Sequence, residues 1–169
     1  LSLFTNNWVT IVNIFALHSF IVLPLVCLFV ARQLKLSWAT GIALGILYSF
    51  IPYHIARLFP GHIFLTVYYI IPLIVLIIMW LFKGEVIFFY KKDTGKYKIL
   101  WNKKNILILS ITILTATSGI YYAFFSVFFI GVAGLVNFLN EKNKTIIISV
   151  SIILSVLFFT LFLQLLPTY

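Results

Sequence analysis

The chain has 169 residues, of which 63% are hydrophobic and 9% are charged, and its mean hydropathy is +1.17. Soluble domains are about half apolar and about a quarter charged, so this composition excludes a water-soluble globular fold. The formal net charge of +9 does not indicate a nucleic-acid partner, because the lysines gather in short stretches between apolar runs. Lysines in that arrangement are typical of the cytoplasmic loops of membrane proteins.

Apolar runs of about 20 residues recur along the chain, which predicts an all-α fold, a polytopic transmembrane helical bundle. A β-barrel would instead show segments of about 10 residues with alternating polarity, and these runs have no such alternation. We expect one transmembrane helical domain over residues 1–169. Because the chain begins without methionine, almost directly before an apolar run, we also expect it to be a fragment of a longer membrane protein. About six membrane spans are expected, over residues 9–30, 38–51, 63–82, 106–118, 122–138 and 145–166.

The first two spans carry polar or small residues that point to helix packing. Asn13 and His18 lie within the first span and are expected to bond a neighbouring helix, with a ligand role as the alternative. Gly41, Gly45 and Ser49 recur every four residues in the second span, which places them on one face. Small residues at this spacing let another helix approach closely, so this face is expected to serve packing.

The remaining elements are a third span with a polar stripe, a basic loop and three further apolar runs. His62, Thr66 and Tyr69 fall at helical spacing along the third span. Residues 83–104 are rich in lysine and are expected to form a cytoplasmic loop that faces anionic headgroups. The next two apolar runs are each shorter than a full span. They form either a tight hairpin whose helices extend into the flanking loops, which we favour, or a re-entrant segment.

The basic residues predict how the chain lies in the membrane. All twelve lysines and arginines except Arg57 fall in segments expected to be cytoplasmic, which leaves both ends of the chain outside. We therefore expect a multi-pass protein of the cytoplasmic cell membrane. A charge that breaks the topological rule at the membrane is a functional-site candidate by default, so Arg57 is the first candidate.

Arg57 belongs to a group of basic and polar residues in one outer loop. His54 lies three residues earlier, on the same face of a helical turn, and His62 follows a Pro-Gly turn that can fold it back. Arginine offers phosphate oxygens a planar fork of donors, and histidine beside an anion gains positive charge. We therefore expect His54, Arg57, His62 and Tyr69 to bind the phosphate of a membrane lipid. Two alternatives stay open: Arg57 as an interfacial anchor, or a metal held by the two histidines, for which no nearby carboxylate or cysteine completes a site.

The three carboxylates of the chain, Glu85, Asp93 and Glu141, are all expected on the cytoplasmic side. Chemistry at the outer face would therefore need a general base, or a ligand for a divalent metal, from residues outside this chain. The sequence contains no nucleophile triad, phosphate loop or cofactor fingerprint, and it identifies no catalytic residue, cofactor or metal site of its own.

Four segments of the chain share a recognisable pattern: residues 3–8 (LFTNNW), 52–57 (PYHIAR), 61–73 (GHIFLTVYYIIPL) and 119–125 (GIYYAFF). They resemble the bacterial polytopic glycosyltransferases of the C superfamily, which use polyprenyl-phosphate sugars. The resemblance implies that an acceptor hydroxyl attacks the lipid-linked sugar at the outer face of the cytoplasmic membrane. In such enzymes an acidic residue in the first outer loop serves as base or metal ligand. This chain departs from that pattern, because it begins after the place where that loop would be.

The resemblance implies a membrane-embedded segment of a glycosyltransferase for cell-surface polysaccharide or glycan assembly, with Arg57, His54 and His62 at the donor phosphate. Its partners would be membrane lipid, the polyprenyl-phosphate sugar and a saccharide acceptor. Enzyme activity is expected only as part of the larger glycosyltransferase, with any divalent metal bound through residues outside this chain. Two alternatives remain. One is half of a transporter or flippase for a lipid-linked saccharide, against which the absence of a repeat between the two halves of the sequence argues mildly. The other is a non-catalytic membrane assembly subunit.

Overall fold

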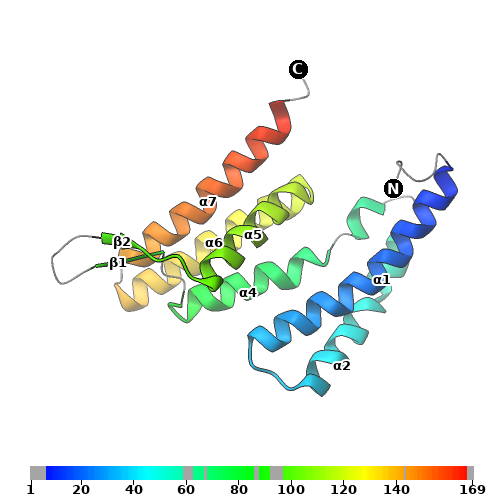
Figure 1. Cartoon of the computed structure of the whole chain (residues 1–169), viewed down its shortest axis with the longest axis horizontal. Helices are drawn as coiled ribbons and strands as arrows, with labels where there is room; N and C mark the ends of the chain where they lie inside the picture. The colour runs from blue at the N-terminus through cyan, green and yellow to red at the C-terminus, as the bar shows by residue number, and fades with distance from the viewer. Residues whose placement is uncertain are drawn as a thin grey trace. The chain divides into compact units, whose positions relative to one another are not determined.

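The protein is an all-α helical membrane protein, as its composition predicts. The computed structural model describes residues 7–58, 63–66, 68–85, 88–91, 97–142 and 144–166. Helices make up almost all of the structure within these residues (Figure 1). The chain divides into two compact units, unit 1 (residues 1–73) and unit 2 (residues 74–169). In chain order the elements are α1 (Trp8–Gln33), α2 (Trp38–Ser49), α3 (Pro52–Leu58), η1 (Ile63–Thr66), α4 (Ile70–Phe82), β1 (Phe89–Lys91), β2 (Tyr97–Ile99), α5 (Lys103–Thr117), α6 (Ile120–Glu141) and α7 (Lys144–Leu165).

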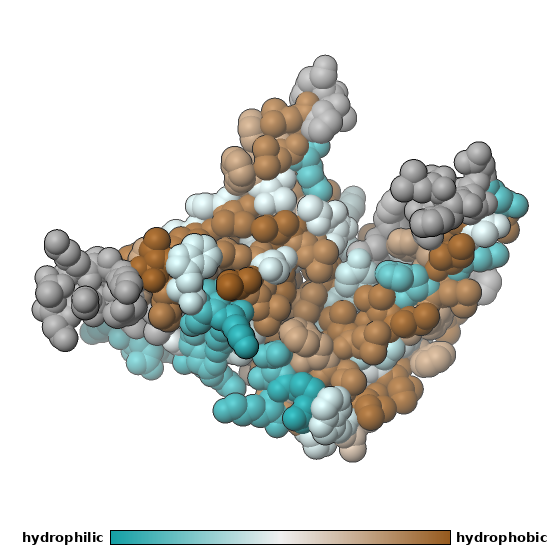
Figure 2. Space-filling model, viewed as in Figure 1, coloured by the Kyte–Doolittle hydropathy of each residue, from teal (hydrophilic) through white to brown (hydrophobic). Residues whose placement is uncertain are grey.

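Four helical segments in the described part of the chain are long and apolar enough to cross a membrane: Trp8–Gln33, Trp38–Leu58, Ile120–Glu141 and Thr145–Gln164. The second of these consists of α2 and α3 together. Large apolar side chains cover much of the visible surface, brown in Figure 2, which suits helices that face lipid rather than water. α4 has 13 residues and α5 has 15, fewer than the roughly 20 that a span needs. The expected number of six spans therefore stays a prediction.

In unit 1, α1 and α2 lie side by side as a helical hairpin closed by a short turn (Figure 1). Ser37 caps α2, because its hydroxyl accepts a hydrogen bond from the backbone N–H of Thr40 at 3.1 Å. Arg32, in the last turn of α1, donates to the carbonyl of Leu36, and its guanidinium lies 4.7 Å from the ring centroid of Trp38. Arg32 is therefore held by contacts to the turn and to the first residue of α2.

The small-residue face of α2 holds this hairpin together. Gly41, Gly45 and Ser49 are all buried. A Cβ atom added at Gly45 would lie 2.9 Å from the backbone oxygen of Pro24 and 3.1 Å from its Cα, so the backbones of α1 and α2 come into direct contact there. The predicted packing role of this face is confirmed.

The continuous helix predicted over residues 63–82 is wrong, because the chain turns before α4 begins. η1 ends at Thr66, and Tyr68 and Tyr69 lie in a turn that leads into α4 at Ile70. Thr66 and Tyr69 therefore do not share one helical stripe. Pro72 falls in the first turn of α4, where a backbone N–H has no intrahelical partner to lose, and the helix continues through it.

In unit 2, α5, α6 and α7 pack against one another (Figure 1). The buried side chains of Ala116, Ala123 and Leu157 meet in a small apolar cluster where the three helices come together. α5 and α6 are joined by Ser118 and Gly119 alone, and Gly119 has a φ of +134°, a conformation that residues with a side chain rarely adopt. The predicted tight hairpin is confirmed, and both helices extend beyond the apolar runs into the flanking loops.

The lysine-rich segment between α4 and α5 contains more regular structure than the predicted loop. β1 and β2 pair as an antiparallel hairpin, in which Phe89 lies opposite Ile99. Phe88, just before β1, is buried, and its backbone N–H donates to the hydroxyl of Ser149 in α7 at 3.2 Å. This hairpin is therefore anchored to the helices of unit 2, through a contact between residues far apart in the sequence.

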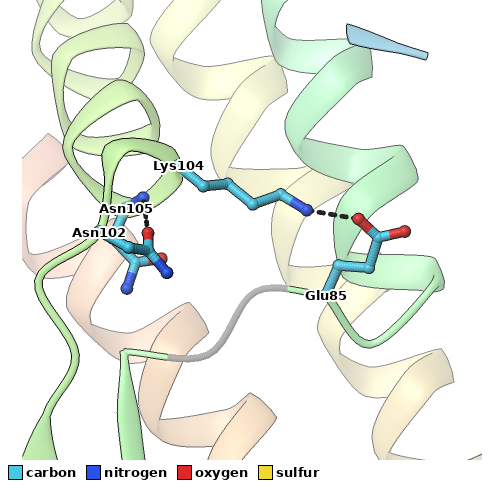
Figure 3. A network of polar contacts seen from close by, with 4 residues as sticks. All are labelled: Glu85, Asn102, Lys104 and Asn105. Carbon is cyan, nitrogen blue, oxygen red and sulfur yellow. Dashed lines mark hydrogen bonds and ion pairs between the residues drawn. The ribbon is translucent and has the colours of Figure 1, made fainter. Parts of the chain in front are cut away.

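A polar cluster fixes the start of α5 beside the end of α4 (Figure 3). Lys104 forms an ion pair with Glu85, and its ammonium lies 4.4 Å from the ring centroid of Trp80. Asn102 caps α5 by accepting a hydrogen bond from the backbone N–H of Asn105 at 2.7 Å. Because the ion pair is partly exposed, its contribution to stability is small, and its main effect is to position these helix ends.

Candidate functional site: a partly exposed arginine on a buried histidine network

The predicted site begins at α3, the short helix that follows α2. Pro52 takes its first position, where the fixed φ of proline suits a helix start. The backbone N–H of His54 donates to the carbonyl of Ile51 at 2.9 Å, which closes the turn between the two helices. His54 is buried within unit 1, whereas Arg57, one helical turn later, stays partly exposed.

His54 has none of its surface exposed (0%), and both of its ring nitrogens have partners. Nε2 lies 2.9 Å from Oγ of Ser19 in α1, and Nδ1 lies 2.8 Å from the hydroxyl of Tyr68 in the turn before α4. The ring of Phe20 covers the imidazole, with the two ring centroids 4.3 Å apart. His54 therefore joins α1, α3 and the turn before α4, and neither ring nitrogen points to an external ligand.

Tyr68, the partner of Nδ1, is itself held by Tyr48 of α2. The hydroxyl of Tyr68 donates to the carbonyl of Tyr48 at 3.0 Å, and the hydroxyl of Tyr48 donates to the carbonyl of Tyr68 at 3.3 Å. The two rings meet edge to face with centroids 5.0 Å apart. This reciprocal pair ties the turn before α4 to α2, so all parts of unit 1 that surround His54 are connected.

The hydroxyl protons restrict the state of His54. The hydroxyl of Ser19 lies 2.7 Å from the carbonyl of Ala16, and that of Tyr68 lies 3.0 Å from the carbonyl of Tyr48, and a hydroxyl that donates to its carbonyl can only accept from the ring. A neutral imidazole has one N–H and can donate to only one of the two hydroxyls. The other hydroxyl must then turn its proton from its carbonyl to the ring. The described residues place no carboxylate in this network, which favours the neutral ring over a buried, unbalanced charge.

Arg57 is connected to the same network through aromatic rings. Its guanidinium lies 5.1 Å from the ring centroid of Tyr53, and the ring of Tyr53 meets that of Tyr68 edge to face, at 5.7 Å and 86°. A guanidinium that stacks on a ring keeps its in-plane N–H donors for other acceptors. In the part of the chain that the structure describes, no carboxylate forms an ion pair with Arg57. This arginine is therefore oriented by protein contacts while its charge is available to an anion.

The structure separates the four residues that the sequence groups into one site. His54 supports the interior of unit 1, Arg57 is partly exposed, and Tyr69 is partly buried in the turn before α4. His62 lies outside the described residues. A role of these residues in donor binding stays a prediction, and Arg57 is the one whose geometry suits direct contact with a ligand.

Sequence reasoning did not identify the partners that position His54 and Arg57. It expected Asn13 and His18 to bond a neighbouring helix, but both are exposed within unit 1, so that expectation stays a prediction. The inward-facing polar residue of this stretch is Ser19, directly after His18. One signal was available: a histidine inside an apolar segment needs partners for both ring nitrogens, and hydroxyl side chains are the commonest polar groups in this sequence's apolar runs.

Comparisons with protein-family models, with curated proteins and with solved structures give no match to this chain. The described residues contain no group of three or more histidine, cysteine, aspartate or glutamate side chains that could hold a metal ion. What the site binds must therefore follow from its own chemistry. That chemistry is a partly exposed arginine, oriented by a tyrosine that packs on a buried histidine network.

Proposed function

We propose that this chain is a membrane-embedded part of a glycosyltransferase that uses a polyprenyl-phosphate-linked sugar, and that Arg57 binds the donor phosphate. The observation that carries the proposal is the placement of Arg57: partly exposed, stacked on Tyr53, and on a helix fixed by His54. A guanidinium oriented in this way offers two parallel N–H donors to phosphate oxygens at little further cost in side-chain entropy.

The surroundings of Arg57 suit the lipid part of such a donor. Three large apolar side chains near it in sequence, Leu47, Phe50 and Ile55, are exposed by 71%, 64% and 44%. A cation beside an exposed apolar surface matches an amphipathic ligand with a phosphate at one end and a hydrocarbon chain at the other. The prenyl chain would lie along the apolar helices of unit 1 while Arg57 contacts the phosphate.

The proposal assigns donor binding to this chain and the remaining chemistry to other parts of the enzyme. Glycosyl transfer to a hydroxyl needs a general base. From the distribution of charge along the sequence, we place all the carboxylates of this chain on the lysine-rich, cytoplasmic side of the membrane. Arg57 falls outside the lysine-rich segments, on the opposite side. We place Arg57 at the outer face of the cytoplasmic membrane, with both ends of the chain outside, and the saccharide acceptor at the same face.

Arg57→Gln is expected to weaken binding of polyprenyl phosphate by about tenfold to a hundredfold, because a hydrogen bond to a charged group contributes about 1.5–3 kcal/mol. The complete protein in lipid nanodiscs would be titrated with polyprenyl phosphate and the dissociation constant measured for each variant. Arg32→Gln is the matched control, since Arg32 is the other arginine of the chain and also stacks on an aromatic ring.

The two substitutions separate a specific site from general attraction of an anionic lipid to positive charge. We expect Arg32→Gln to leave the dissociation constant unchanged, and Arg57→Lys to fall between wild type and Arg57→Gln, because lysine keeps the charge but not the planar fork. Equal affinities for wild type and Arg57→Gln would reject the proposed donor site.

A further inference from the structure

A second candidate site lies in unit 2, where the end of α4 meets the end of α6. A pocket of about 530 Å³ opens there, lined by Phe82, Lys83, Gly84, Asn137 and Glu141. This volume lies in the range of small-molecule sites, which is roughly 300–1,000 Å³. The lining combines a cation, an anion and an amide with an apolar ring, so it offers a distinct contact to each part of a small zwitterionic ligand.

The end of α4 shapes one wall of this pocket. Gly84 has a φ of +65°, and its backbone N–H donates to the carbonyl of Leu81 at 3.0 Å. The next backbone N–H, of Glu85, donates to the carbonyl of Trp80 at 2.9 Å. These two bonds form a Schellman motif, which ends a helix at a residue in the left-handed conformation. The carbonyl of Phe82 takes no part in this motif. It accepts a hydrogen bond from Nδ2 of Asn137 in α6 at 3.2 Å.

Asn137 has an acceptor that the protein does not use. Only 4% of the residue is exposed, and its Oδ1 has no hydrogen-bond partner among the described residues. Exchanging the amide oxygen and nitrogen would not satisfy it, because Oδ1 would then face the carbonyl of Phe82. Buried polar atoms are almost always paired, and Asn137 lines the pocket, so a ligand bound there is one source of the donor that Oδ1 lacks.

The charged residues of the pocket are also available to a ligand. Lys83 and Glu141 are both exposed, and within the described residues neither takes part in an ion pair. The pocket therefore combines a cation for an anionic group, a carboxylate for a cationic group, and a buried acceptor that needs an N–H or O–H donor. An alkylammonium joined to a phosphate carries all three complementary features.

We propose that this pocket binds a phosphoethanolamine group, with its ammonium between Asn137 Oδ1 and Glu141 and its phosphate at Lys83. The apolar ring in its lining points to a membrane phospholipid as the source, because Phe82 is exposed by 47% and can contact an acyl chain. The site lies on the lysine-rich side of the chain, and it is independent of Arg57 and of the donor proposed to bind there.

The test is lipid retention by the complete protein, measured by native mass spectrometry after release from nanodiscs that contain equal amounts of phosphatidylethanolamine, phosphatidylglycerol and phosphatidylcholine. We expect the wild-type protein to retain phosphatidylethanolamine in preference to the other two. Glu141→Gln is expected to reduce this preference about tenfold, since it removes a charge-assisted hydrogen bond to the ammonium. Lys83→Gln is expected to weaken retention through the phosphate.

Lys142→Gln is the matched control, because Lys142 follows Glu141 directly, is exposed, and does not line the pocket. It should leave the preference unchanged. Glu141 is exposed, so its substitution removes a ligand contact without disturbing the core. Retention of all three lipids to the same extent, or a preference that Glu141→Gln does not alter, would overturn the proposed site.

A second arm separates the lipid from a soluble compound of the same headgroup chemistry. Glycerophosphoethanolamine would be titrated against the nanodisc-embedded protein that holds phosphatidylethanolamine. If it displaces the lipid only at a large excess, the acyl chains contribute and the lipid is the ligand. If it binds as tightly as the lipid, the headgroup chemistry stands and the assignment to a membrane phospholipid is wrong.

Discussion

His54→Phe is expected to destabilise unit 1 by about 1–3 kcal/mol. The substitution removes the bonds to Ser19 and Tyr68, and hydrogen bonds between helices in membrane proteins contribute about 0.6–1.7 kcal/mol each. The larger phenyl ring must also fit a fully enclosed space beside Phe20, which adds strain. The free energy of unfolding would be measured by SDS titration of the micelle-bound protein, followed by circular dichroism.

Two further variants distinguish the loss of hydrogen bonds from a loss of packing. Ser19→Ala alone removes the hydrogen bond to Nε2 of His54 and leaves the packing of the imidazole in place, so it should account for only part of the loss seen in His54→Phe. Ser151→Ala, on an exposed position of α7, is the control and should change stability little. If His54→Phe proved no more destabilising than Ser151→Ala, the buried network would have no structural importance.

Gly45→Leu is expected to have the second large effect, by forcing α1 and α2 apart. Even the first carbon of a side chain at this position would lie 2.9 Å from the backbone oxygen of Pro24, and a backbone atom cannot move aside as the end of a flexible side chain can. Overpacking of this kind costs about 1–3 kcal/mol, and here the whole hairpin must adjust. The loss in free energy of unfolding would be measured by the same SDS titration.

Gly131→Ala provides the comparison for this prediction. Gly131 also lies within a helix, but a Cβ atom there would meet nothing within 4 Å. Alanine favours a helix over glycine by about 0.5–1 kcal/mol, so this variant should be as stable as the wild-type protein or slightly more stable. Equal losses at residues 45 and 131 would mean that helix contact is not the reason for a glycine at either position.

The membrane class, the small-residue face of α2 and the hairpin of α5 and α6 were all predictable, because each follows from local composition or spacing. Gly41, Gly45 and Ser49 recur at a fixed interval and need only a neighbouring helix to have their effect. The break between η1 and α4 was not predictable in this way. A run of apolar and aromatic residues continues through residues 63–82, and composition does not distinguish a turn there from a helix.

The direction in which His54 points could not be predicted either. Its spacing from Arg57 places both on one side of a helical turn, but it does not show which side is packed. The partners that decide this, Ser19 and Tyr68, are 35 and 14 residues away in the sequence. The same holds for Asn137, whose bond to Phe82 joins residues 55 apart. Contacts at such separations arise from tertiary packing and leave no local pattern.

Photolabelling would locate the bound donor lipid on the chain. The complete protein in nanodiscs would be irradiated with a polyprenyl phosphate that carries a photoreactive group next to the phosphate, and the labelled peptide identified by mass spectrometry. We predict label in α3 that is lost in Arg57→Gln and retained in Arg32→Gln. Label confined to the lysine-rich segment between α4 and α5, or label in α3 that does not depend on Arg57, would show that Arg57 does not bind the donor phosphate.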